Sequence, residues 1–315
     1  MTADVSGIHH ITAIASDPRR TAAFYQKLLG LRLIKRTVNF DDPETYHLYF
    51  GDHRGTPGTI LTFFPYPHAA PGRFGAGQAV EITFAIPRAA LSQWIDRLVV
   101  QAKAFEGPEV RFGETIIRCK DPDGLVIELV ATDIGASERA AAIWATPDIP
   151  ADMAIRGLHA VTLWVEDGTE TAGILIDHLG FAAAGHDGER RRYVAGRSGI
   201  GQIVDLRSIP GLLPGKSGAG TVHHVAFRAA DAAQQAGIRA SLKGARIGVT
   251  AVIDRTYFQS IYFREPGGVL FEVATDTPGF TIDEPLAALG SRLMLPQQHE
   301  PKRATIEARL PKLDD

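Results

Sequence analysis

The sequence has a single cysteine, no long apolar run and no excess of positive charge. Cys119 has no partner for an internal disulfide, and no apolar run is long enough to cross a membrane. The opening MTADVSGIHH lacks the basic and apolar regions of a signal peptide. A formal net charge of -3 leaves no basic surplus to neutralise nucleic-acid phosphates. We therefore expect a cytoplasmic protein that acts on a small molecule, with no nucleic-acid or membrane partner.

The chain is long enough for two domains. Its 315 residues exceed the usual size of one hydrophobic core, at roughly 150 residues per domain. The composition is 45% hydrophobic and 22% charged, with 32 glycines and 19 prolines. These values are typical of a folded protein rich in turns, so extensive disorder is not expected.

Four segments of the chain begin in the same way. They are GIHHITAIA from Gly7, GQAVEITFAI from Gly77, GLHAVTLWV from Gly157 and GTVHHVAFRA from Gly220. Each alternates like a β-strand and precedes a helix-like stretch, which is followed by short strand-like runs broken by turn residues. We therefore predict an α+β fold built from four β-α-β-β-β modules.

The helix expected in the first module has clear start and stop signals. Asp17 can cap it, Pro18 suits its first position, and Gly30 can end it. The corresponding helices of the other modules are predicted over residues 87–101, 167–179 and 229–243.

The repeats divide the chain into two halves and a tail. Modules one and two predict an N-terminal domain over residues 1–150, and modules three and four a C-terminal domain over residues 151–280. The segment 135–155 is rich in Ala, Pro and Asp and lacks strand alternation, so we expect a linker with room for one helical turn. The tail, residues 281–315, is polar and helix-prone and is predicted to pack across both domains.

Two histidine pairs stand in the opening strands of modules one and four, at His9-His10 and His223-His224. Because successive side chains of a strand point to opposite faces, only one histidine of each pair is expected on a given side. His9 and His223 alternate with apolar residues, which predicts burial in the core. His10 and His224 lie on mixed faces that could line a cavity.

A glutamate stands at the same place near the end of modules two and four. The two segments, DPDGLVIELVATD and EPGGVLFEVATDTPG, contain Glu128 and Glu272. An ionised carboxylate in so apolar a strand is costly to bury unless a cation meets it. Two imidazoles and one carboxylate around a metal leave three positions open, as in non-haem iron(II) oxygenases. We predict that His10, His224 and Glu272 bind Fe(II), although Mn(II) would suit the same ligands.

The other two modules provide an internal comparison. Aligning the repeats puts Glu81, Ala160 and Glu128 at the three ligand positions of a second potential site. That site has no imidazole at these positions, so we expect one site that can bind a metal and one degenerate site that cannot. Glu128 is expected to have a structural role. His47 and His159 are interpreted as packing or supporting residues.

These features resemble the vicinal oxygen chelate superfamily of glyoxalases, bleomycin resistance proteins and extradiol dioxygenases. Its β-α-β-β-β modules form curved mixed sheets around a metal. The resemblance covers nearly the whole chain and is closest to ring-cleaving dioxygenases of the hydroquinone type. It is carried by HHITAI, IKRTVNF, YHLYFGD with GTPGT, HHVAF, DRTYFQSIYFREPGGVLFE and LPQQHEP. In that family the ligands come from the first and fourth modules, which again gives His10, His224 and Glu272.

The resemblance also implies a set of residues beside the substrate or the ligands. They are His9, Thr12, His223, Arg255 and Tyr262. The expected acid is Tyr262 or one of these histidines. For His9 and His223 this implied position differs from the core position that strand alternation predicts.

The expected activity is insertion of O2 into a dihydroxylated aromatic ring. The resemblance favours a hydroquinone, whereas the residues leave hydroquinone and catechol open. Aromatic residues of the sheets could form a wall for the ring or belong to the core: Phe40, Phe63, Phe64 and Tyr257.

Two other functions stay open at this point, and a homo-oligomer is compatible with all three. One is a metal-dependent lyase or isomerase of glyoxalase type, whose sites usually have a second carboxylate ligand. The other is a metal-free protein that binds an aromatic compound or a drug and would not need both His10 and His224.

Overall fold

The protein is described by a computed structural model over residues 4–133, 142–196 and 199–313. Its strands form two curved sheets of eight strands each. Within the described residues, no helix is both long and apolar enough to span a membrane.

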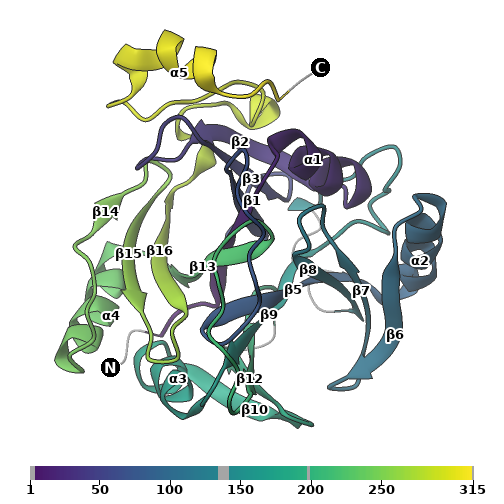
Figure 1. The fold of residues 1–315 in the computed structure, drawn as a ribbon, viewed down its shortest axis with the longest axis vertical. Coiled ribbons are helices and arrows are strands. Elements are labelled where there is room, and N and C mark those ends of the chain that lie inside the picture. Colours follow the sequence, from purple (N-terminus) through teal and green to yellow (C-terminus); the bar gives the residue numbers. More distant parts are fainter. Residues whose placement is uncertain (1–3, 134–141, 197–198, 314–315) are drawn as a thin grey trace.

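The first sheet joins modules one and four (Figure 1). Module one contributes β1 (Ile8–Ala15), β2 (Arg32–Val38), β3 (Tyr46–Gly51) and β4 (Ile60–Pro65). Module four contributes β13 (Thr221–Ala229), β14 (Ile253–Asp254), β15 (Phe258–Arg264) and β16 (Leu270–Pro278). The hydrogen-bonded order is β14-β15-β16-β13-β1-β4-β3-β2, so the antiparallel pair β1 and β13 forms the seam between the modules.

The second sheet joins modules two and three in the same way. Module two contributes β5 (Gln78–Pro87), β6 (Phe105–Arg111), β7 (Glu114–Lys120) and β8 (Val126–Thr132). Module three contributes β9 (Gly157–Val165), β10 (Phe181–Asp187), β11 (Arg190–Ala195) and β12 (Ile203–Ser208). The order is β10-β11-β12-β9-β5-β8-β7-β6, with β5 and β9 antiparallel at the seam and both parallel and antiparallel pairs beside it. The predicted α+β fold of four modules with mixed sheets is confirmed.

Each sheet takes one module from each half of the sequence. The boundaries predicted at residues 1–150 and 151–280 therefore describe the order of the modules along the chain and not the hydrogen-bonded units. As a division into domains they stay a prediction.

The predicted helices are present, but three of them combine two helix types. They are α1 (Pro18–Ala22) with η1 (Ala23–Leu28), η2 (Arg88–Ala90) with α2 (Leu91–Val100), α3 (Thr169–Gly173) with η4 (Ile174–His178), and α4 (Ala232–Gly244). The Asp17 carboxylate accepts hydrogen bonds from the backbone of Arg19 and Arg20, as expected for the cap. The second halves, η1 and η4, are π-helical: in η1 the Leu29 N–H donates to the carbonyl of Phe24, five residues back.

The tail forms short helices, the last of which, α5, lies above β2 in Figure 1. They are η5 (Phe280–Ile282), η6 (Leu286–Ala288), η7 (Glu300–Lys302) and α5 (Arg303–Arg309). The fully buried Lys35 ammonium of β2 donates to Asp283 at 2.6 Å and to Glu284 at 2.5 Å. Asp283 also accepts a hydrogen bond from the hydroxyl of Tyr257, in module four, at 2.9 Å. The tail thus contacts residues from both halves of the sequence.

The predicted linker is described only in part. Residues 135–141 lie outside the described residues. Residues 142–155 contain turns and an isolated bridge between Thr146 and Ile149.

Candidate metal centre

The three predicted ligands meet at the seam of the first sheet. His10 lies on β1, His224 on β13 and Glu272 on β16, and all three side chains are buried. In the ladder Thr12 pairs with His224 and Ala226 with Glu272, so three adjacent strands carry the site. Their potential ligand atoms lie within 4.8 Å of one another, and this is the one such group of His, Cys, Asp or Glu found among the described residues.

The distances between these atoms fit a single divalent cation. Glu272 Oε2 lies 2.9 Å from His224 Nε2 and 3.4 Å from His10 Nε2, and the two Nε2 atoms are 3.4 Å apart. Ligand atoms about 2.1 Å from a metal and at right angles to each other lie about 3.0 Å apart. Despite these short distances, buried Glu272 Oε2 has no hydrogen-bond partner of acceptable geometry. An unsatisfied buried carboxylate oxygen is costly, and a cation would satisfy it.

The charge states also suit a metal. Burial by itself would raise the pKa of Glu272, but His10 and His224 hold that pKa well below its usual value. Burial lowers the pKa of His224, so its ring is neutral at neutral pH. The other carboxylate oxygen, Glu272 Oε1, accepts a hydrogen bond from the Ser260 hydroxyl at 2.5 Å. An anionic carboxylate and a neutral imidazole are the forms that bind a divalent cation.

A second histidine supports each ligand histidine. His10 Nδ1 lies 3.0 Å from His9 Nδ1, and His224 Nδ1 lies 2.8 Å from His223 Nδ1. An imidazole that binds a metal through Nε2 keeps its proton on Nδ1, so the two ligands would donate and the outer histidines would accept. Such partners fix the orientation of the ligand rings.

Two β-bulges correct the prediction that His9 and His223 point into the core. The ladder between β1 and β13 shifts its register at His9 and again at His223, so each is an extra residue opposite a single partner. An extra residue breaks the alternation of faces. His9 is buried, but its ring packs against His10 and Phe258; His223 is exposed and lines the cavity beside the ligands. Both histidines thus lie beside the predicted ligands, although strand alternation alone placed them in the core. Their roles stay a prediction.

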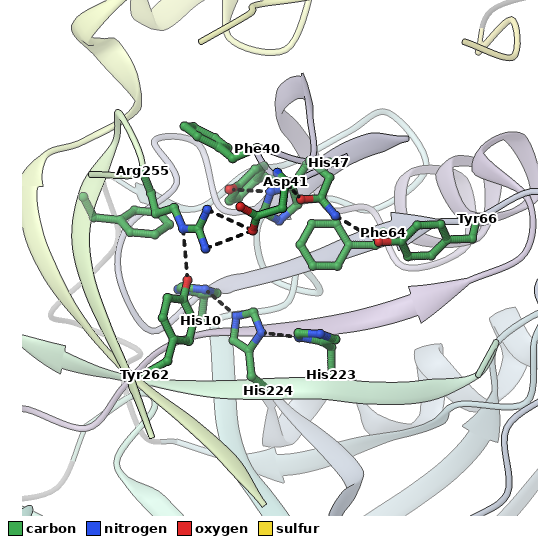
Figure 2. A pocket seen from close by; sticks show the side chains of 13 residues that line it. His10, Phe40, Asp41, His47, Phe64, Tyr66, His223, His224, Arg255 and Tyr262 are labelled. Atoms are coloured by element: carbon green, nitrogen blue, oxygen red, sulfur yellow. Dashed lines mark hydrogen bonds and ion pairs between the residues drawn. The ribbon is translucent and has the colours of Figure 1, made fainter. Parts of the chain in front are cut away.

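A cavity of about 250 Å³ opens beside the ligands, with aromatic side chains on its walls. Figure 2 shows Phe40, Asp41 and Phe64 across this space from His10 and His224. Its volume lies just below the range of about 300–1,000 Å³ that is usual for drug-sized ligands, which suits a single ring.

The aromatic wall predicted from the sequence is half correct. Phe40 and Phe64 line the cavity. Phe63 is buried in the core instead, where its ring packs on Tyr25 of η1 with centroids 4.6 Å apart. Tyr257 lies outside this cavity, against Phe280 of the tail.

Tyr262 and Arg255 form one side of the cavity (Figure 2). Arg255 Nε donates to the Tyr262 hydroxyl at 3.3 Å, and its guanidinium nitrogens lie 3.4 Å from Asp41. The Tyr262 ring stands edge-on to His224, with centroids 5.7 Å apart. Burial and the charge of Glu272 raise the pKa of Tyr262, so its hydroxyl stays protonated.

A chain of hydrogen bonds leads from the cavity wall to Thr12, and the sequence did not predict it. Tyr49 donates to His47 Nδ1 at 2.9 Å, and His47 Nε2 is 2.8 Å from the Thr62 hydroxyl. That hydroxyl donates to Thr12 at 2.8 Å. His47 thus links the cavity wall to the strand that carries His10, which is compatible with the supporting role expected for it. The one sequence feature that could have indicated this chain is the placement of His47 and Tyr49 two residues apart on β3, on the same face of the strand.

The second sheet has the same strand pairing at the equivalent positions, but different side chains occupy them. Glu81 pairs with Thr162, and Thr83 with Glu128, at the positions that His224 and Glu272 occupy in the first sheet. The guanidinium of Arg111 donates to Glu128 at 2.9 and 3.1 Å and lies 3.8 Å from Glu81. A protein cation thus sits between these two carboxylates.

The remaining charges of this second cluster are also paired. Arg190 binds Glu81 through two hydrogen bonds, at 2.6 and 2.9 Å. His159, like His9, lies at a bulge, and it bonds to Glu114 at 3.0 Å. Ion pairs between protein side chains therefore fill this second site. It corresponds to the degenerate site expected from the repeats.

A family model and known proteins match this chain over most of its length. The model of the Glyoxalase/Bleomycin resistance protein/Dioxygenase superfamily matches residues 7–129 and 157–273. The chain is 44% identical over 310 residues to the provisionally named ring-cleaving dioxygenase MhqO of Bacillus subtilis (strain 168), covering 98% of this chain and 96% of that protein. It is 35% identical to the chlorohydroquinone/hydroquinone 1,2-dioxygenase of Sphingobium indicum (strain DSM 16413 / UT26S), covering 94% and 93%.

Solved structures give the same picture. A crystal structure of a provisionally named dioxygenase from Bacillus subtilis subsp. subtilis str. 168 is 43% identical, with a TM-score of 0.94 over 99% of this chain and 98% of that one. Glyoxalase I from Zea mays, 16% identical, shares the fold with a TM-score of 0.61 over 86% and 92%. With its four modules, its paired sheets and these full-length matches, the chain belongs to the glyoxalase/bleomycin resistance protein/dioxygenase superfamily.

Proposed function

We propose that this protein is a non-haem iron(II) dioxygenase that opens the ring of a hydroquinone. The observation that carries the proposal is the trio His10, His224 and Glu272, whose unsatisfied carboxylate oxygen faces two imidazoles beside an aromatic-lined cavity. The names of the relatives from Bacillus subtilis and Sphingobium indicum support ring cleavage, and the latter supports a hydroquinone.

The donor set supports iron and leaves room for the reactants. A ferrous ion held by the three side chains would supply neighbouring positions for a phenolate oxygen and for dioxygen. Because the three ligands come from adjacent strands, they lie on one side of the site and leave the cavity side open. Mn(II) prefers similar donors, so its use is part of the same proposal.

The protein's own residues would position the ring and supply a proton. Phe64 and Phe258 give apolar faces against which an aromatic ring can pack. Tyr262 accepts a hydrogen bond from Arg255, so its own proton can point elsewhere, toward an oxygen of the substrate. A protonated tyrosine at this place would act as the general acid. In this proposal His9, Thr12 and His223 keep the ligand rings and the cavity floor in place.

The glyoxalase-type alternative is less well supported. The cluster of potential ligands found in the described residues contains one carboxylate, whereas the expected glyoxalase set has two. The likeness to glyoxalase I concerns the fold alone. The cytoplasmic location inferred from the sequence stays part of the proposal, since a reducing compartment preserves ferrous iron.

Oxygen uptake by the protein after anaerobic loading with Fe(II) tests the proposal. With a panel of hydroquinones and catechols, we expect iron-dependent uptake of one O2 per ring and a new ring-opened chromophore. Glu272→Gln should lose both bound iron and uptake, whereas Glu189→Gln, at an exposed site in the second sheet, should retain both. Absence of uptake with every diol, in protein shown to contain iron, would refute the proposal.

A further inference from the structure

Most polar groups on the cavity wall already have partners within the protein. Both ring nitrogens of His47 are hydrogen-bonded, to Tyr49 and to Thr62. Arg255 faces both Asp41 and Tyr262. A ligand that enters the cavity therefore finds few free donors away from the predicted metal ligands.

Tyr262 and His223 also line the cavity, but both lie beside the predicted ligands. Away from those ligands, Tyr66 is the exception. It follows β4 directly, and its oxygen accepts a hydrogen bond from Asn39 Nδ2 at 2.9 Å. Asn39 cannot reverse its amide without loss, because its Oδ1 accepts a hydrogen bond from the backbone of Asp41 at 3.0 Å. The Tyr66 O–H itself has no acceptor among the described residues, and burial raises the pKa of Tyr66, which keeps this proton in place.

This free donor lies on the wall opposite the predicted ligands. Figure 2 shows Tyr66 and Phe64 at the far side of the space from His10 and Tyr262. The rings of Phe64 and Tyr66 are neighbours, with centroids 6.4 Å apart, and Phe64 also stands edge-on to His223 at 5.7 Å. A ring packed against Phe64 would thus extend from the metal centre toward Tyr66.

The two classes of aromatic diol differ in where they place the second oxygen. In a 1,2-diol both oxygens lie on one side of the ring, beside the metal. In a 1,4-diol bound through one oxygen, the other oxygen is on the opposite side of the ring and needs a partner there. An unpaired phenolic oxygen held against the aromatic wall would lose hydrogen bonds that it makes in water.

We propose that Tyr66, oriented by Asn39, donates a hydrogen bond to the distal oxygen of a 1,4-diol and so selects hydroquinones over catechols. The inference rests on the proposed function, which it extends to the choice of substrate class. Because this bond is made in the bound substrate and in the transition state alike, its loss weakens binding more than turnover.

Binding under nitrogen to the metal-loaded protein tests this directly, without turnover. Hydroquinone, catechol and phenol are titrated by calorimetry into the unmodified protein and into Tyr66→Phe. We expect the Kd of hydroquinone to rise about tenfold in Tyr66→Phe, as for the loss of one neutral hydrogen bond. The Kd values of catechol and phenol should change less than about twofold. In turnover, KM for hydroquinone should rise while kcat changes little.

Two further variants make the test specific. In Asn39→Asp the carboxylate still accepts from the Asp41 backbone but no longer donates to Tyr66, which would then donate to position 39. The preference for hydroquinone over phenol should fall as in Tyr66→Phe. Tyr193→Phe, a buried tyrosine of the second sheet, is the matched control and should leave all three Kd values unchanged.

The outcomes separate this inference from the proposed function. Equal losses for hydroquinone and phenol in Tyr66→Phe, or no loss for either, would overturn the role of Tyr66. If hydroquinone binds through Tyr66 but no O2 is consumed, the recognition stands and the proposed reaction fails.

Discussion

Arg111 should be essential to the stability of the second sheet, because it occupies the place that a metal would take in the first. Glu128 is fully buried, and Arg111 provides two of its hydrogen bonds. Arg118 and Thr83 provide the others. Burial raises the pKa of Glu128, but Arg111 outweighs that effect and lowers it. Replacement of Arg111 by methionine keeps much of the side-chain volume and removes the charge.

The expected loss of stability depends on the ion pairs that remain in the variant. Removing one partner of a buried ion pair costs about 3–5 kcal/mol, because the other charge is left without compensation. Arg118 still binds Glu128 in the variant, and Arg190 still binds Glu81. We therefore expect a loss near the lower limit, about 3 kcal/mol at pH 7.

Urea unfolding followed by tryptophan fluorescence is the assay. Two of the three tryptophans, Trp94 on α2 and Trp164 on β9, belong to the modules of the second sheet, so most of the signal reports on this part of the molecule. Trp144 contacts module one instead. Arg88→Met is the matched control, since the Arg88–Asp133 pair is largely exposed, and it should cost less than about 0.5 kcal/mol.

The pH dependence gives a second criterion. In the unmodified protein the lowered pKa of Glu128 stabilises the fold above its usual value of 4.5, and this contribution is lost as the pH falls below that value. In Arg111→Met burial dominates and the carboxylate is costly at neutral pH, so the deficit should shrink toward pH 4. A loss below about 1 kcal/mol at pH 7, or a deficit that does not vary with pH, would refute this account of the second cluster.

Two further predictions concern acid stability and metal binding. Burial raises the pKa of Glu114, but hydrogen bonds from His159 and Arg192 outweigh it and lower that pKa to about 2. The resulting stabilisation is complete above the usual pKa of 4.5 and is lost as the pH falls toward 2. Glu114→Gln should therefore lower the Tm at pH 7 more than at pH 3, and an equal drop at both pH values would contradict the assignment. Fe(II) or Mn(II) at a hundred times its Kd should raise the free energy of unfolding by about 2.7 kcal/mol, and a chelator should reverse this. Glu272→Gln should lose that gain in thermal unfolding measurements and Glu189→Gln should keep it; a gain retained in Glu272→Gln would place the metal elsewhere.

Local sequence patterns were sufficient for the modules and for the choice of three residues that the structure brings together, His10, His224 and Glu272. The repeated opening strands and the shared place of Glu128 and Glu272 gave the four modules and their internal comparison. They did not give the pairing of modules one and four, because strand alternation carries no information about which distant strand will be the neighbour. The site itself implied that pairing, since His10 and Glu272 come from these two modules.

The errors at His9 and His223 have a different origin. The predicted orientation of each side chain assumed a regular strand. A bulge depends on the register of the partner strand, which the alternation of apolar residues does not encode. The π-helical turns after Ala22 and Gly173 escaped prediction for a similar reason, since they change the backbone hydrogen bonds while leaving the apolar pattern nearly intact. The Asn39–Tyr66 pair lies in turns that the periodic patterns do not cover.

The seam between β1 and β13 determines when the three predicted metal ligands can come together during synthesis. His10 and His224 are separated by 214 positions, which a ribosome needs roughly 10 to 40 seconds to add. During that interval β1 can pair with β4 on one edge, while its other edge waits for β13. The seam of the second sheet, between β5 and β9, is complete much earlier. A nascent chain released after residue 150 would contain one of the three predicted ligands and an open strand edge, so the proposed metal site can be complete only after nearly all of the chain has been made.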